Sequence, residues 1–149
     1  MTMLNPRSVF LLLLGLATTQ ALAQDAAADR ALQLDPSIAE VVTGGAWGDA
    51  AGAHGRYRVV VVAEGWEEVR YRVFLQWLEL DSDRRDVRVR VSQDLAILAP
   101  NWWSLTSPSL SLHDGKWILS LQAAEMPMQA PDTELRFQLG PPGQVELLR

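Results

Sequence analysis

Apolar and polar residues alternate with a period of two along most of the chain after residue 55. Neighbouring side chains of a strand point to opposite faces, so this period predicts β-strands. Residues 56–63 are apolar at odd positions and, at their centre, on both faces, which is typical of a strand inside a sheet. The next run repeats the rule at its odd positions, which are Val69, Tyr71, Val73, Leu75 and Trp77. We expect these odd positions to face a core.

A long antiparallel hairpin is predicted over residues 67–92. The polar stretch 81–86 closes its first strand, and valines alternate with arginines on the return. The face of this hairpin directed away from the core is expected to carry four arginines, which are Arg70, Arg72, Arg88 and Arg90. Placing residue 78 opposite residue 88 would set Arg72 across from Asp94.

Two further hairpins follow. Asp114-Gly115 is a two-residue turn signal, and with this turn Leu112 faces Trp117 and Leu110 faces Leu119. After a proline-bounded loop at 126–131, residues 135–139 alternate again, and a Pro-Pro-Gly turn leads into residues 145–148 as the last strand.

The region before residue 56 is less regular. Residues 38–42 favour a strand, although Pro36 could equally open a short helix there. Residues 43–55 contain five glycines around Trp47, and this density of glycine predicts a mobile loop. In total about seven to eight short strands are expected, which favours an all-β fold, an antiparallel β-sandwich, with a small open barrel as the alternative.

The first residues have the pattern of a secretory signal peptide. Arg7 supplies a positive charge, residues 9–17 are apolar, and Ala21-Leu22-Ala23 is a small-x-small cleavage site. The apolar run is shorter than the roughly 20 residues that span a bilayer. We therefore expect cleavage after Ala23 and a periplasmic or secreted protein without stable membrane insertion. Residues 24–33 are then a flexible lead, and 34–149 form a single β domain.

Composition narrows the possible chemistry. The chain has no cysteine, which excludes disulfides, a thiolate nucleophile and cysteine-ligated metals, and which fits a bacterial envelope better than a eukaryotic extracellular space. The net charge is -5, and it becomes -6 when the signal is removed, since that step deletes Arg7 and no acid. An acidic protein is a poor match for nucleic acid, whose backbone is bound mainly through clustered basic residues.

No catalytic, metal-binding or cofactor-binding residues are predicted. His54 and His113 are the only histidines, and neither has an evident partner in the sequence. Glu67 and Glu68 are adjacent and would point to opposite faces of a strand, so they are a poor acid-base pair. The acidic segment 81–86 departs from a calcium loop, because Arg85 stands where the third acid should be.

Tryptophan is the one unusual feature, with six in the chain. Trp77 and Trp117 have the parity of core residues. Trp66 has the parity of the arginines, and the adjacent Trp102 and Trp103 would point in opposite directions, so at least one of these three is expected outside the main core. The candidate partner-binding residues are Trp66, Trp102, Trp103, Arg70 and Arg72. Burial under loops is the alternative for the tryptophans, and an ordinary solvated sheet face is the alternative for the arginines.

These features together predict an exported, non-enzymatic β-sandwich that binds another envelope or secreted protein, as an inhibitor, accessory subunit or adaptor. A glycan-binding module that uses exposed tryptophans is the alternative, and a carboxylate-dependent hydrolase is a weaker one. Protein binding predicts an exposed apolar patch or an open sheet edge, whereas glycan binding predicts a groove with a flat tryptophan beside carboxylates and amides.

Overall fold

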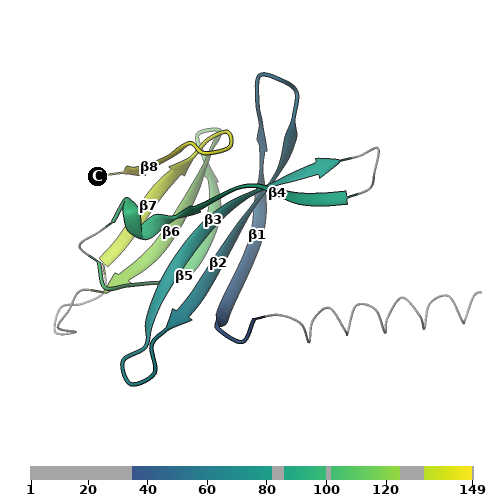
Figure 1. Ribbon diagram of the computed structural model, residues 1–149. Helices are drawn as coiled ribbons and strands as arrows, with labels where there is room; N and C mark the ends of the chain where they lie inside the picture. The colour runs from purple at the N-terminus through teal and green to yellow at the C-terminus, as the bar shows by residue number, and fades with distance from the viewer. Residues whose placement is uncertain (1–34, 82–85, 100–101, 125–132, 149) are drawn as a thin grey trace, which may run out of the picture. The chain divides into compact units, whose positions relative to one another are not determined.

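The computed structural model describes residues 35–81, 86–99, 102–124 and 133–148, and these residues form two four-stranded antiparallel sheets (Figure 1). The first sheet consists of β1 (Ile38–Gly48), β2 (His54–Glu64), β3 (Arg70–Asp81) and β4 (Asp86–Asp94), and is followed by the short 3-10 helix η1 (Leu95–Ile97). The second sheet consists of β5 (Ser104–His113), β6 (Lys116–Ala124), β7 (Thr133–Leu139) and β8 (Val145–Leu148). Strands that follow one another in sequence are neighbours in each sheet. All of them belong to one compact unit, Ser37–Arg149.

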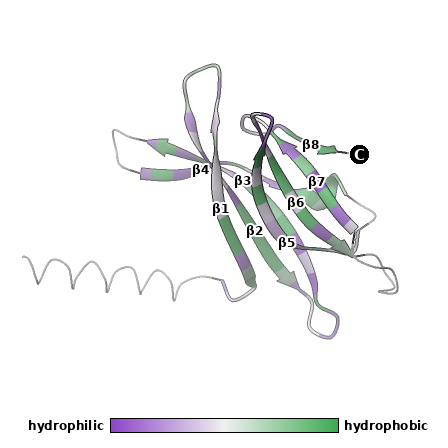
Figure 2. Ribbon diagram, turned by 180° about the vertical axis from the view of Figure 1, so that it is seen from behind, coloured by the Kyte–Doolittle hydropathy of each residue, from purple (hydrophilic) through white to green (hydrophobic). Residues whose placement is uncertain are grey.

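The two sheets pack together as in a β-sandwich, and the core lies between them. Most side chains at the predicted odd positions of β2 and β3 are buried, and they meet buried side chains of β6 and β7. Tyr71 is only partly buried against this core, and the expectation for Val69 is wrong, because Val69 lies before β3 begins and is 47% exposed. Much of β2 and β6 is coloured hydrophobic in Figure 2. The largest fully buried side chains are Trp77, Tyr57, Phe137, Leu75, Leu95, Leu105, Leu119, Leu121, Val59 and Val73. The expected all-β fold with two packed antiparallel sheets is confirmed.

The hairpin at Asp114-Gly115 has the predicted register, and the predicted last hairpin is present. Leu112 pairs with Trp117 and Leu110 with Leu119 across the Asp114-Gly115 turn, and β7 pairs with β8. The predicted signal peptide at 1–23, the lead at 24–33 and the loop at 126–131 lie outside the described residues.

Most of the glycine-rich stretch 43–55, predicted as a mobile loop from its composition, is strand: residues 43–48 end β1, residues 54–55 begin β2, and only residues 49–53 form the turn between them. β1 continues through Gly44 and Gly45 to Gly48, and Trp47 is buried. Gly45 has a φ of +66°, and a Cβ atom there would lie 2.7 Å from Tyr57 and 2.9 Å from Trp117. Position 45 therefore requires glycine because the rings of Tyr57 and Trp117 occupy the space of a side chain. The glycine is not explained by a need for a mobile backbone.

The predicted register of the β3–β4 hairpin is wrong throughout, since Leu78 lies opposite Val89 and not residue 88, and β4 in addition contains a bulge. Trp77 pairs with Val91 but Leu78 pairs with Val89, so Arg90 is the extra residue. A shift of one residue turns each side chain to the other face of the sheet. Val87 and Val89 consequently lie on the outer face and are 54% and 45% exposed.

The same bulge separates the four arginines that were expected to share one face. Arg70 and Arg72 remain on the outer face, whereas Arg88 pairs across the ladder with Glu79, on the opposite side. Asp94 lies opposite Phe74 and not opposite Arg72, although the Arg72 side chain still reaches it diagonally.

One backbone carbonyl accepts two hydrogen bonds from side chains of the first sheet. The hydroxyl of Tyr57 and the indole N–H of Trp77 both donate hydrogen bonds to the carbonyl oxygen of Gly140, at 3.1 and 2.9 Å. Gly140 lies in the turn between β7 and β8, while both donors belong to the core of the first sheet. Burial raises the pKa of Tyr57 to about 12.

We predict that Gly45→Ala destabilises the fold more than Gly52→Ala. Both glycines have positive φ, at +66° and +84°, so both alanines carry backbone strain of about 1–2 kcal/mol. Only at Gly45 does the new Cβ meet other atoms, because nothing lies within 4 Å at Gly52. Overpacking adds about 1–3 kcal/mol, which urea unfolding of the two variants would resolve. Equal losses of stability would contradict the packing role of Gly45.

We predict that the free energy of unfolding decreases at alkaline pH because Tyr57 ionises. The pKa in the fold is about 12, above the value near 10 of an unfolded tyrosine, so the folded state retains a proton that the unfolded state has lost. Stability from this group is complete below pH 10 and falls as the pH rises to 12, by about 2–3 kcal/mol. Tyr57→Phe should lose roughly 1 kcal/mol at neutral pH and lack this alkaline decline. Parallel denaturation curves from pH 9 to 12 for both proteins would contradict the assignment.

Candidate functional site

The turn between β2 and β3, residues 65–69, is closed at its base by an ion pair; we call it the Trp66 turn. Glu64 and Arg70 form the last pair of the ladder, and Arg70 donates from Nε and Nη2 to Oε2 of Glu64, at 3.1 and 2.9 Å. Gly65 has a φ of +97°, and a Cβ atom there would lie 2.3 Å from the carbonyl oxygen of Glu68. The turn therefore depends on glycine and on an ion pair.

Trp66 projects from this turn into solvent. Its side chain is 96% exposed, and Val69 at the end of the turn is 47% exposed. Glu67 and Glu68 are exposed too, and neither makes a hydrogen bond or ion pair with the described residues. The expectation that at least one tryptophan lies outside the core is confirmed by Trp66.

Behind the turn, three of the predicted partner-binding residues lie together around Glu64. Arg72 forms an ion pair with Oε1 of Glu64, at 2.8 Å, and a second ion pair with Asp94. The guanidinium of Arg70 lies over the ring of Trp103, 5.6 Å from its centroid. The hydrogen bond from Arg70, reinforced by Arg72, holds the pKa of Glu64 below its ordinary value despite some desolvation.

This arrangement gives Arg70 and Arg72 a structural role. Each guanidinium faces a carboxylate of its own chain, and the two arginines are balanced by Glu64 and Asp94. Asp94 also accepts a hydrogen bond from the N–H of Ala96, so the cluster continues into the start of η1. The arginines position the base of the Trp66 turn, and their predicted contact with a partner stays a prediction.

Trp102 and Trp103 have different surroundings, as expected for neighbours in an extended segment. Trp102 is partly buried and packs against the hydrophobic core. Trp103 lies below Arg70, and its backbone N–H donates to the carbonyl of Ala124 at 2.9 Å. Of the two, only Trp103 contributes to the cluster behind the Trp66 turn.

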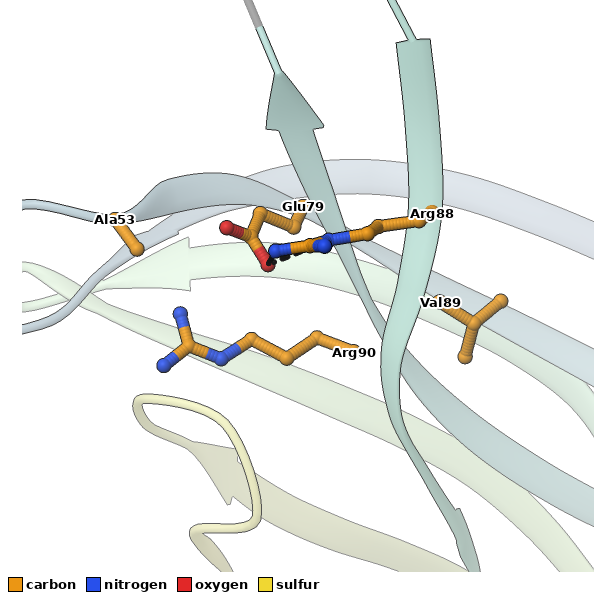
Figure 3. Close-up of a pocket in the computed structure, with 5 residues that line it drawn as sticks. All are labelled: Ala53, Glu79, Arg88, Val89 and Arg90. Atoms are coloured by element: carbon orange, nitrogen blue, oxygen red, sulfur yellow. Dashed lines mark hydrogen bonds and ion pairs between the residues drawn. The ribbon is translucent and has the colours of Figure 1, made fainter.

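A separate open pocket of about 490 Å³ lies along the far part of β3 and β4 (Figure 3). It is lined by Ala53, Glu79, Arg88, Val89 and Arg90. Figure 3 shows the guanidinium of Arg88 joined to Glu79, and this pair has an N–O distance of 3.0 Å. Arg90 pairs with Asp49 at 3.0 Å and lies over the ring of Trp47. Both arginines are thus neutralised within the chain, which makes this pocket a weaker candidate for an anion site.

The other residues considered for catalysis or metal binding do not converge. His54 is exposed, and His113 lies 3.4 Å from the exposed carboxylate of Asp114. Among the described residues no three His, Asp or Glu side chains could together hold a metal ion. Asp83 of the acidic segment lies outside the described residues.

Two arginines of β2, Arg56 and Arg58, were not selected from the sequence. Their signal was their even parity, which places both on the outer face, opposite the uncharged Leu78 and Gln76 of β3.

No helix in the described part of the chain is long and apolar enough to cross a membrane. No family model, curated protein or solved structure matches the chain.

We predict that Glu64→Gln lowers stability at pH 7 but much less at pH 3. The pKa of Glu64 is lowered in the fold, so its contribution is present above the ordinary pKa and is lost as the pH falls through the folded value. The deficit at pH 7 should be on the order of 1 kcal/mol or less, because the pair is partly exposed. Thermal unfolding between pH 3 and 7 measures it. Glu68→Gln is the control and should change little, and an equal deficit for Glu64→Gln at both pH values would contradict the ion-pair role.

Proposed function

We propose that this chain is an exported, non-enzymatic protein-interaction module of the cell envelope, which binds another protein through the Trp66 turn. The observation that carries this proposal is the 96% exposure of Trp66 on a turn held by Gly65 and by the Glu64–Arg70 ion pair. Export is inferred from the sequence pattern of residues 1–23.

Trp66 can contribute to affinity in two ways, through the apolar surface that a partner buries and through the small conformational entropy lost on binding. A tryptophan buries a large apolar surface when a partner covers it, and its N–H can still form a hydrogen bond. Because the turn is closed at its base by an ion pair, little conformational freedom is lost on binding, so more of that burial contributes to affinity. Tryptophan is among the residues most enriched in interface hot spots for these reasons. An inhibitor, an accessory subunit or an adaptor could each use such an anchor.

Glycan binding is the second candidate, because exposed Glu67 and Glu68 stand beside Trp66 and could accept hydrogen bonds from sugar hydroxyls. Protein binding is favoured because Trp66 stands out from a turn. The two pockets whose linings are described, at β3–β4 and at the β7–β8 turn, contain no tryptophan.

An affinity capture tests both candidates. The full chain with a C-terminal tag is expressed in the organism that produces it, and bound molecules are recovered from the envelope fraction. We expect a stoichiometric protein with the parent chain and at least a tenfold loss with Trp66→Ala. Ile97→Ala is the matched control, because Ile97 is 72% exposed on a different element, and it should capture as the parent does. Capture of polysaccharide alone would favour glycan binding, and capture unaffected by Trp66→Ala would overturn the proposed site.

A further inference from the structure

The outer face of the first sheet carries two arginines that lack a carboxylate. Arg56 and Arg58 lie on the same face of β2, since they are two residues apart. Arg58 donates from Nε to the neutral amide of Gln76 at 2.7 Å, and the Arg56 side chain makes no hydrogen bond or ion pair with any described residue. In contrast, the other described arginines of this sheet all form ion pairs with acids, and they are Arg70, Arg72, Arg88 and Arg90.

The bulge in β4 places apolar side chains next to these arginines. Arg56, Leu78 and Val89 are cross-strand partners and so form one row across β2, β3 and β4. Val87, in the following row, is opposite Leu80. Val89 therefore lies two strand spacings from Arg56, about 10 Å away, and Val87 lies farther along the strand. Leu78 itself is buried, so the solvent-accessible members of this surface are Arg56, Arg58, Val87 and Val89, which we call the outer patch.

The Trp66 turn has the complementary composition. Glu67 and Glu68 are exposed carboxylates without a partner among the described residues, and Trp66 and Val69 are exposed apolar side chains. The outer patch offers two cations beside two exposed valines, and the turn offers two anions beside a tryptophan and a valine. Arg56 and Glu64 are at opposite ends of β2, about 26 Å apart, so the turn cannot reach the outer patch of its own chain.

We propose that the partner of the Trp66 turn is the outer patch of a second copy of this chain. Glu67 and Glu68 of one copy pair with Arg56 and Arg58 of the next, and Trp66 covers the valines of β4. This inference rests on the proposed function, since it names the partner of the same turn. The two contacting surfaces differ, so each copy can engage one neighbour through its turn and another through its patch, which gives a ring or an open chain.

A charge exchange tests the proposal directly. The first variant, Arg56→Glu with Arg58→Glu, makes the patch acidic like the turn. The second variant, Glu67→Arg with Glu68→Arg, makes the turn basic like the patch. Each variant alone should fail to associate because like charges meet at every contact. In a mixture each turn meets a patch of opposite charge, so association should return.

Sedimentation velocity of the chain purified from the envelope fraction measures these species. The parent should show association that rises with concentration and weakens at least tenfold between low and high salt. Each variant alone should bind at least tenfold more weakly than the parent, and the equimolar mixture should recover most of that loss. Circular dichroism and thermal unfolding confirm that each variant is folded. A variant that does not fold is replaced by the single reversals Arg56→Glu and Glu67→Arg, tested in the same way.

A parent chain that stays monomeric at several hundred micromolar in low salt would overturn self-docking, and so would a mixture that fails to associate when both folded variants are present. Neither result affects the Trp66-dependent capture of a different protein. The proposed function and this inference therefore fail separately.

Discussion

The fold depends on the satisfaction of two polar groups in the core of the first sheet. Tyr57 and Trp77 pack edge to face, with ring centroids 6.3 Å apart, and a buried hydroxyl or indole N–H without an acceptor would cost about 1–3 kcal/mol. Both find the carbonyl of Gly140, whose turn is closed by its own hydrogen bonds with Gln144. Neither sheet can slide along the other without losing both contacts. The relative position of the two sheets is therefore set by hydrogen bonding as well as by packing, which alone is not directional.

The parts of the fold that could be predicted are those governed by local alternation. The buried odd positions of β2 and β3 follow from a period of two, and the β5–β6 register follows from Asp114-Gly115. The bulge at Arg90 could not be predicted this way, because unbroken alternation would keep Val87 and Val89 on the same face as Val91, whereas the structure turns them outward. The choice is made by distant groups on the inner side, since Asp49 and Trp47 hold the Arg90 side chain there.

The same distinction applies to the candidate site. Parity alone indicated that Trp66 lies away from the core, and the structure places it almost wholly in solvent. The ion pairs of Arg70 and Arg72 with Glu64 were not predicted, because alternation alone does not show that β2 extends to Glu64 and brings its carboxylate beside both arginines. An arginine on a sheet face can be judged as a binding residue only when its ion-pair partners within the chain are known. Arg56 and Arg58 differ from the other described arginines of the first sheet because neither pairs with a described acid.

Gly45 and Trp117 are far apart in sequence but occupy one volume between the sheets. The Trp117 ring lies where a side chain at position 45 would begin. A larger residue at 45 therefore requires space from Trp117 as well as from Tyr57, and a smaller residue at 117 alone would open a cavity. Residue sizes at positions 45 and 117 should therefore covary among descendants of this sequence. Such covariation would reflect how closely the two sheets approach each other.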